Sequence, residues 1–559
     1  MIARAVTGCY NTRSPKVKFF DDVKMYARFA RGLSDFLKNP LSLDEARAIV
    51  RRRMEERESN FLRVVERGVF GYPASPFLPL FKLAGCTTED LRGAVRSKGL
   101  ETTLRDLRRA GVYVTFEEFK GRTPIVRGGL TLSVKAHDFD NPFLSHYYSA
   151  ETGGSTGAGT RINIDLDHLA ADTPFNMLAL DAHRVLDVPK AIWRGVLPDP
   201  SGLNYILRGA RMGRVPEKWF TPIGRADYKP ILKYRVATTA IVHAGSAFGV
   251  SIPRPEPVTF DEAATIAAWM VERIRIRGAC LVFCLVSTAL RVALAARDMG
   301  ADLRGGVFEV GGEPPTEAKV RAITAAGARC YPTYHFGECG RVGMGCARPL
   351  DANDVHFFRD GLAVIEYNRQ VPGFDVAVDA FCFTSLLPTT PKIMLNVELD
   401  DYGVIETRSC GCPLEAYGYS EHIREIRSFR KLTGEGVTLV GSAMLSILED
   451  VLPARFGGSP LDYQLLEEED ENGFTKLSLV VSPRVQLADE STVIETVLNA
   501  LGPSAVEDSL TRATWKKANI FRIKRMEPIR TARGKLMPLH FMKSGAAAKR
   551  VAAGSMSAS

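Results

Sequence analysis

Apolar residues recur at helical spacing in two segments of the middle part of the chain. In residues 261–274 they fall every three or four positions and Gly278 follows shortly after, so this pattern predicts a helix. A second helix is predicted at 316–326, because two prolines stand before it and a glycine stands after it. The apolar run 279–290 lies between them and predicts a buried strand followed by the start of a helix, since it is too short to span a membrane.

Apolar runs alternate with helix-like patterns over residues 160–340, which predicts an α/β fold class. Beyond residue 430 the pattern is that of a second, smaller α/β unit. An acidic stretch at 467–473 predicts the tip of a hairpin in this unit. The elements expected there are a helix at 442–452, strands at 461–466 and 476–481, a helix at 491–501 and a strand at 519–524.

Length and composition narrow the class of protein. The chain has 559 residues, of which 45% are hydrophobic and 25% charged, so it is an ordinary globular chain with at least two domains. No apolar signal region is visible near the N-terminus, and ten cysteines without such a signal favour a reduced, cytoplasmic setting. We expect neither a disulfide framework nor a membrane partner.

The net charge of +9 raises the question of a nucleic-acid partner. The basic residues are spread over short groups such as 424–431 and 516–525, without interleaved aromatic residues or zinc-finger spacing. A small polyanionic substrate such as a nucleotide accounts for this excess equally well. We therefore expect no nucleic-acid partner.

Glycine and hydroxyl residues crowd the segment 152–160, which is followed by an extended pattern at 161–165. Glycines let the backbone approach an anion, and Ser155, Thr156 and Thr160 add donors, so the segment suits phosphate binding. It matches neither the P-loop nor the dinucleotide fingerprint, because no Gly-Lys-Ser/Thr follows and the glycine spacing differs. Taken alone, a plain surface turn explains it as well.

Five further segments follow this loop in a fixed order: Gly-Gly-Glu-Pro at 311–314, Tyr-His-Phe-Gly-Glu at 334–338, Asp-Asp-Tyr-Gly at 400–403, Arg427 with Gly436, and Thr-Ala-Arg-Gly-Lys at 531–535. This order resembles the adenylate-forming superfamily (the acyl-CoA synthetase or ANL superfamily). The Gly-Gly-Glu-Pro segment and a Cys-Gly-Cys-Pro segment at 410–413 are most similar to its phenylacetate-CoA ligase branch, which also holds enzymes that adenylylate a deazaflavin coenzyme. The resemblance covers roughly residues 140–540, and residues 1–140 carry no motif.

The resemblance implies a role for each motif residue. Lys535 and Glu338 are the expected catalytic residues: Lys535 bridges the α-phosphate and the attacking carboxylate, and Glu338 holds Mg²⁺. Asp401 accepts the ribose hydroxyls, although Asp400 is an alternative one residue away. The remaining nucleotide-binding residues are Ser155, Thr156 and Gly157 for the β- and γ-phosphates, Gly312, Glu313 and Tyr334 for the adenine, and Arg427 for the ribose or a phosphate.

The activity implied is AMP-forming ligation. ATP and Mg²⁺ activate a small carboxylic acid as an acyl-adenylate, and coenzyme A then accepts the acyl group. The alternatives are adenylylation alone, transfer of the acyl group to the thiol of a carrier or other acceptor protein, and a non-catalytic nucleotide-binding or scaffold protein. The sequence leaves open which acid is used and whether the chain forms a homodimer.

The resemblance also implies the domain organisation. Residues 1–428 form a large, multi-layer adenylation domain, whose first 140 residues are helical or irregular, and residues 429–544 form a small, mobile α/β lid. The tail at 545–559 is expected to be disordered. One departure concerns the hinge, where Phe429 and Arg430 stand in place of the usual pair of aspartates and put the second half-reaction in doubt.

A metal site is predicted from cysteine and histidine spacing. Cys346 and His356 form a C-x₉-H pattern, and Cys410 and Cys412 form a C-x-C pattern downstream. Three thiolates and one imidazole suit tetrahedral zinc in a structural role, although free cysteines are also common as small buried apolar residues.

Overall fold

The structure is a computed structural model of the 559-residue chain. It describes residues 15–151, 161–197, 199–222, 232–312, 315–370, 377–428, 433–434, 437–438, 446–469, 475–500, 521–530, 536 and 539–542.

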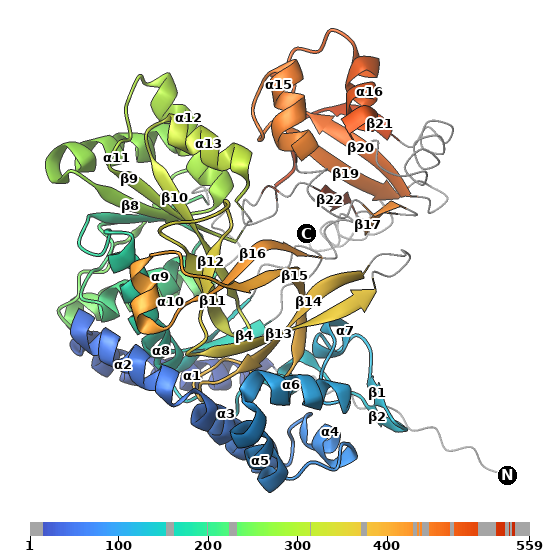
Figure 1. The fold of residues 1–559 in the computed structure, drawn as a ribbon. Coiled ribbons are helices and arrows are strands. Elements are labelled where there is room, and N and C mark those ends of the chain that lie inside the picture. Colours follow the sequence, from blue (N-terminus) through green and yellow to red (C-terminus); the bar gives the residue numbers. More distant parts are fainter. Residues whose placement is uncertain are drawn as a thin grey trace.

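A twelve-stranded sheet forms the centre of the molecule (Figure 1). Its strands are β5 (Lys190–Trp193), β6 (Lys218–Thr221), β7 (Pro255–Pro257), β8 (Cys280–Cys284), β9 (Gly306–Gly311), β10 (Arg329–Phe336), β11 (Gly340–Gly345), β12 (Val355–Phe357), β13 (Leu362–Gln370), β14 (Ala377–Ser385), β15 (Val397–Thr407) and β16 (Glu421–Ser428). They lie in the order β13-β14-β15-β16-β12-β11-β10-β9-β8-β5-β6-β7. The half from β10 to β7 is parallel and the half from β11 to β13 is antiparallel, so the direction changes between β10 and β11.

Helices cover both faces of the parallel half, as its apolar strands require. Ala191 and Trp193 of β5 pack in one apolar cluster with residues of α11 and α12, whereas Ile192 packs in another with residues of α9 and α10. The expected mixed α/β fold class with a large sheet is confirmed. The helices of this region are α8 (Leu166–Ala182), α9 (Ser201–Arg211), α10 (Leu232–Ala247), α11 (Ala263–Arg277), α12 (Val286–Asp298) and α13 (Glu317–Ala325).

The elements predicted from periodicity in this half are present. The helix expected at 261–274 is α11, and Gly278 ends it in the left-handed conformation with φ +76°. The helix expected at 316–326 is α13, whose N-cap is Thr316. The run 279–290 contains strand β8 and the start of α12, and its residues 280–290 are buried, as predicted.

The N-terminal part is mainly helical. Its residues 29–50 pack with α8, α9 and α10, and its residues 61–139 cover the antiparallel half. Val114 pairs with Val397 at the start of β15, and the Asn396 side chain donates hydrogen bonds to Leu104 O at 2.8 Å and Val112 O at 3.2 Å. This part therefore shares one apolar core with β13, β14 and β15. Its elements are α1 (Pro15–Lys38), α2 (Leu43–Glu55), α3 (Arg57–Val65), the π-helical turn Glu66–Phe70, α4 (Leu78–Leu83), α5 (Thr88–Lys98), α6 (Leu100–Arg109), α7 (Phe116–Phe119), β1 (Ile125–Arg127) and β2 (Leu130–Leu132).

The C-terminal part has a sheet of its own, in the order β21-β20-β19-β22, drawn in orange and red in Figure 1. The expected strands at 461–466, 476–481 and 519–524 are β19 (Tyr463–Glu469), β20 (Thr475–Val481) and β21 (Phe521–Arg525), and β22 is Leu539–Met542. β19 pairs antiparallel with β20, as the predicted hairpin requires, but residues 467–469 of the expected tip belong to β19 because they continue its pairing. The rest of the expected tip, 470–473, lies outside the described residues. The helix expected at 491–501 is α16 (Glu490–Ala500), whereas the described part of 442–452 is a π-helical turn, Ile447–Val451, that leads into α15 (Leu452–Phe456).

A buried ion pair joins the C-terminal part to α13. Lys319 Nζ lies 2.8 Å from Glu449 Oε1, with side chains that are each 5% exposed, and the Thr316 hydroxyl also bonds to Glu449. Leu290 of α12 packs beside this contact region with Leu461 and Leu536. In the part of the chain that the structure describes, no helix is both long and apolar enough to cross a membrane.

We predict that Lys319→Met destabilises the protein by about 3–5 kcal/mol, because it leaves the buried Glu449 carboxylate without its cation. Urea unfolding followed by circular dichroism measures the change. The matched control is Arg321→Ala, which removes an ion pair with Asp450 whose side chains are 64% and 40% exposed, and should cost under about 1 kcal/mol. Equal losses of unfolding free energy in the two variants would contradict the conclusion that burial makes the Lys319 ion pair costly to break.

Candidate functional site

Three of the predicted nucleotide-site segments meet where the sheet changes direction. Gly311 ends β9 and pairs with Thr333 of β10, so Gly312 and Tyr334 follow at the carboxyl ends of neighbouring parallel strands. Gly312 has φ +87°, a left-handed conformation that glycine adopts at little cost. The register between β10 and β11 shifts at Tyr334 and His335. Carboxyl ends of strands at such a switch point commonly bind ligands in α/β sheets.

A hydrogen bond joins two of these segments directly. Tyr334 Oη donates to Asp401 Oδ2 at 2.9 Å, across 67 positions of sequence. Burial and the adjacent Asp401 carboxylate hold the pKa of Tyr334 well above 10, so the phenol stays neutral and remains a donor. Phe336 packs edge-on against the Tyr334 ring, with 4.9 Å between the ring centroids. Asp401, one of the two aspartates considered for the ribose, therefore lies against Tyr334.

A β-bulge sets the register that places Arg427, the predicted ribose arginine, opposite Tyr402, the residue after Asp401. Tyr402 of β15 pairs with Arg427 of β16, but Val404 pairs with Arg424, so β16 has one more residue in this interval than β15. Glu425 lies in the bulge with φ +51°. Gly403 lies opposite, where an added Cβ would come within 2.6 Å of Arg424 O, so only glycine fits beneath the bulge.

Glu338, the predicted Mg²⁺ ligand, has an unexpected partner. Lys120 Nζ lies 2.6 Å from Glu338 Oε1, and the two side chains are 14% and 8% exposed. Lys120 follows α7 in the region without a motif. A carboxylate oxygen is a suitable donor for Mg²⁺, but here a cation already contacts it.

The other predicted residues of this site lie outside the described part of the chain. Lys535 precedes the described Leu536, and the hinge residues Phe429 and Arg430 follow Ser428. The phosphate loop joins β3 (Tyr147–Glu151) to β4 (Arg161–Asp165), which pair antiparallel, so its predicted extended flanks are confirmed. The predicted nucleotide-binding residues Ser155, Thr156, Gly157 and Glu313 also lie outside the described part of the chain.

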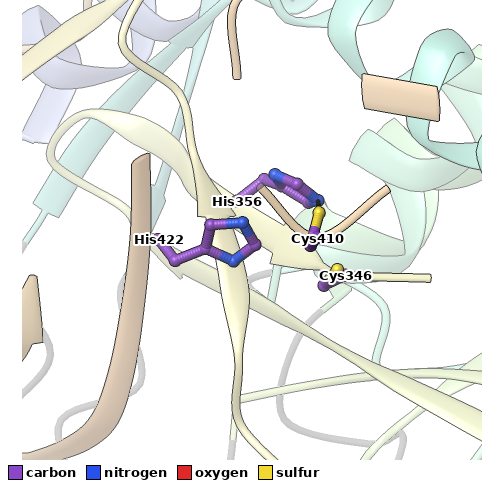
Figure 2. Close-up of side chains that lie close together, drawn as sticks. All are labelled: Cys346, His356, Cys410 and His422. Atoms are coloured by element: carbon purple, nitrogen blue, oxygen red, sulfur yellow. Dashed lines mark hydrogen bonds between the residues drawn. The ribbon is translucent and has the colours of Figure 1, made fainter. Parts of the chain in front are cut away.

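A second candidate site is a cluster of cysteine and histidine side chains (Figure 2). One potential ligand atom from each of Cys346, His356, Cys410 and His422 lies within 4.8 Å of the other three. His356 of β12 and His422 of β16 are paired neighbours in the sheet, and Cys346 directly follows β11. Strand pairing therefore brings together residues from three distant segments.

Hydrogen bonds orient both imidazoles toward the cluster. His356 Nδ1 lies 2.7 Å from Tyr419 O, and its Nε2 lies 3.7 Å from Cys410 Sγ. His422 Nδ1 lies 2.7 Å from Asp354 Oδ1, and its Nε2 is buried without a hydrogen-bond partner. Metal-binding histidines are typically held in this way, with one nitrogen on an oxygen acceptor and the other on the metal.

The carboxylate behind His422 is ionised. Burial opposes ionisation of Asp354, but hydrogen bonds from His422 and the Leu350 N–H and the charge of Arg408 lower its pKa below the usual value. Asp354 therefore accepts a hydrogen bond from His422 Nδ1, which leaves the lone pair of Nε2 for the cluster.

Cys412 belongs to the immediate surroundings of the cluster. Its backbone N–H donates to Cys410 Sγ at 3.4 Å, and a hydrogen bond with Cys346 lowers the pKa of the Cys412 thiol. The structure thus places three of the four predicted zinc residues in the cluster, with His422 as its fourth member in place of the predicted Cys412, which lies next to it. The sequence contained a signal for His422, because Cys412 and His422 repeat the C-x₉-H spacing of Cys346 and His356. Lys120 had no comparable signal.

No protein-family model matches the chain, and no curated protein matches it. Solved structures with some likeness include 2-hydroxyisobutyryl-CoA ligase in complex with 2-HIB-AMP and CoA, at 15% identity and TM-score 0.42, covering 90% of this chain and 92% of that one. Fatty acyl-adenylate ligases from E. coli and L. pneumophila give 11% identity and TM-score 0.38, covering 74% and 70%. McyG A-PCP with phenylalanyl-adenylate gives 10% identity and TM-score 0.42, covering 82% and 66%. Because each TM-score lies below 0.5, these likenesses do not by themselves assign a function.

Proposed function

We propose that this chain is an ATP-dependent ligase that activates a carboxylic acid as an acyl-adenylate and passes the acyl group to coenzyme A. The hydrogen bond between Tyr334 and Asp401 is the observation that carries the proposal. It joins an aromatic ring near the carboxyl end of β10, suited to stack on adenine, with a carboxylate on β15 that is suited to accept from ribose hydroxyls. We further propose the phenylacetate-CoA ligase branch, on the Gly-Gly-Glu-Pro and Cys-Gly-Cys-Pro segments.

In the proposed reaction, a carboxylate oxygen attacks the α-phosphorus of ATP in line with the departing group. The new bond joins that oxygen to phosphorus, and the bond from the α-phosphorus to the bridging oxygen breaks as pyrophosphate leaves. Lys535 neutralises the charge that develops between carboxylate and α-phosphate, and Ser155, Thr156 and Gly157 hold the departing phosphates. Bound at Glu338, Mg²⁺ would supply further charge neutralisation to those phosphates.

The domain division at residue 428 is part of the proposal. A separate four-stranded sheet and the buried contact of Glu449 with Lys319 support a small C-terminal unit that packs on the larger one. Lys535 belongs to this unit, so its approach to the nucleotide depends on that packing. Leu536, next in sequence, is 5% exposed and packs with Leu290 and Leu461.

We predict that the protein catalyses exchange of labelled pyrophosphate into ATP in the presence of a suitable acid. Lys535→Ala should lower this exchange by about 10²–10³-fold, because it removes the donor aimed at the developing charge. Asp401→Asn should raise the ATP concentration for half-maximal exchange by about tenfold or more through weaker ribose binding. The matched control is Lys98→Ala, whose side chain is 54% exposed and contacts Asp106 on the surface.

An acid panel with and without coenzyme A separates the alternatives. Exchange together with a CoA thioester supports the full ligase. Exchange without a thioester supports adenylylation alone or transfer to a protein thiol. If ATP binds but no aryl, fatty or amino-acid-derived acid supports exchange, the ligase proposal is rejected and a non-catalytic nucleotide-binding protein is favoured.

We also propose that the Cys346, His356, Cys410 and His422 cluster binds zinc. Two thiols and two imidazoles suit tetrahedral zinc, and the buried, unpartnered His422 Nε2 supports a fourth ligand from β16. With four protein ligands the ion is structural, and it would cross-link β11, β12 and β16 to the segment after β15.

We predict about one zinc ion per chain by elemental analysis of the purified protein. Cys410→Ser and His422→Asn should each lose it, whereas Cys382→Ser, a buried cysteine of β14 outside the cluster, should retain it. If Cys412→Ser loses zinc and His422→Asn retains it, the fourth ligand is Cys412, as predicted from the spacing, and not His422. Full zinc content in the Cys410→Ser/His422→Asn double variant would refute the site.

A further inference from the structure

The N-terminal region, which carries no recognisable motif, reaches the candidate nucleotide site through Lys120. This lysine directly follows helix α7, which begins with a capping box between Thr115 and Glu118. Arg127 holds the Glu118 carboxylate with two contacts of 2.8 and 2.9 Å. The position of Lys120 is therefore fixed by the local fold.

The contact with Glu338 is short and nearly buried. Lys120 Nζ lies 2.6 Å from Glu338 Oε1, with 14% and 8% of the two side chains exposed. The ammonium also lies 5.4 Å from the centre of the Phe116 ring and 5.9 Å from that of Phe119. The two rings and the low exposure of the pair limit the access of water, which strengthens the attraction between the two charges.

The same N-terminal region also supports the backbone around Glu338. The Lys392 N–H donates to Glu338 O at 3.2 Å, and Lys392 Nζ donates to Ala136 O at 2.6 Å. Ile393 N–H donates to Phe139 O at 2.9 Å. Residues 115–140 thus supply the lysine that holds the Glu338 carboxylate. They also anchor Lys392, whose N–H holds the Glu338 carbonyl.

We propose that Lys120 is a positioning residue that competes with Mg²⁺ for the Glu338 carboxylate. This inference rests on the proposed function, in which Glu338 holds the Mg²⁺ of MgATP. An ammonium at contact distance and a divalent ion on the same carboxylate repel each other, so Mg²⁺ binding requires Lys120 to withdraw. Its flexible stem and three donors allow the ammonium to turn to a phosphate oxygen instead.

Competition has a distinctive consequence. Replacing Lys120 by a neutral side chain removes the competitor, so Mg²⁺ should support ATP binding at a lower concentration. A lysine that only stabilises the fold would not produce this result, since its loss would leave the Mg²⁺ requirement unchanged or weaken nucleotide binding.

The test measures ATP binding to the full-length protein by calorimetry at increasing Mg²⁺ concentrations, with no acid substrate present. In Lys120→Met the Mg²⁺ concentration for half-maximal binding should fall about fivefold or more, as expected for loss of one charge-assisted contact. Lys120→Arg should retain the wild-type value, and Lys98→Met serves as the control for a surface lysine. If Lys120→Met does not fold, Lys120→Gln replaces it.

An unchanged or raised half-saturation in the neutral variant overturns the inference. Because binding is measured without acid, the inference and the ligase proposal can fail separately. Mg²⁺-dependent ATP binding without pyrophosphate exchange rejects only the ligase, whereas exchange together with an unchanged Mg²⁺ requirement rejects only the competition. Absence of MgATP binding by the wild-type protein rejects both.

Discussion

The change of strand direction between β10 and β11 is the constraint on which both candidate sites depend. On the parallel side, the pairing of β9 with β10 ends at Gly311 and Thr333, so Gly312 and Tyr334 follow it at one edge of the sheet. On the antiparallel side, the pairing of β12 with β16 brings His356 beside His422. One continuous sheet therefore carries both the candidate nucleotide site and the cysteine–histidine cluster on neighbouring strands. Backbone hydrogen bonds between strands set each position, and these bonds do not involve the side chains.

Several buried charges in the described part of the chain are paired with an opposite charge. Glu338 is paired with Lys120, and Glu449 is paired with Lys319. Arg341, which is 5% exposed, contacts Glu309, which is 1% exposed, in the core near β9. Pairing makes such burial tolerable, but the attraction mainly offsets the cost of removing both charges from water. These pairs consequently specify which segments lie together more than they add to net stability.

Local sequence signals predicted the elements that depend on neighbouring residues. The stripe of α11 with Gly278 and the N-cap Thr316 of α13 are encoded within one helix, and the acidic turn with its flanking strands predicted the β19–β20 hairpin. The π-helical turn at 447–451 was missed because its hydrogen-bond pattern has no distinct apolar period. Lys120 was missed because its partner lies 218 positions away, and only tertiary packing brings the two together.

The bulge in β16 has a consequence for how this chain can change over generations. His422 and Arg427 lie on the same strand with Glu425 as the extra residue between them. Deleting that one residue would restore regular alternation along β16, with Arg427 still opposite Tyr402 and Arg424 still opposite Val404. It would also remove the backbone kink beneath which only glycine fits at position 403, so in related proteins the extra residue and the glycine should be kept or lost together.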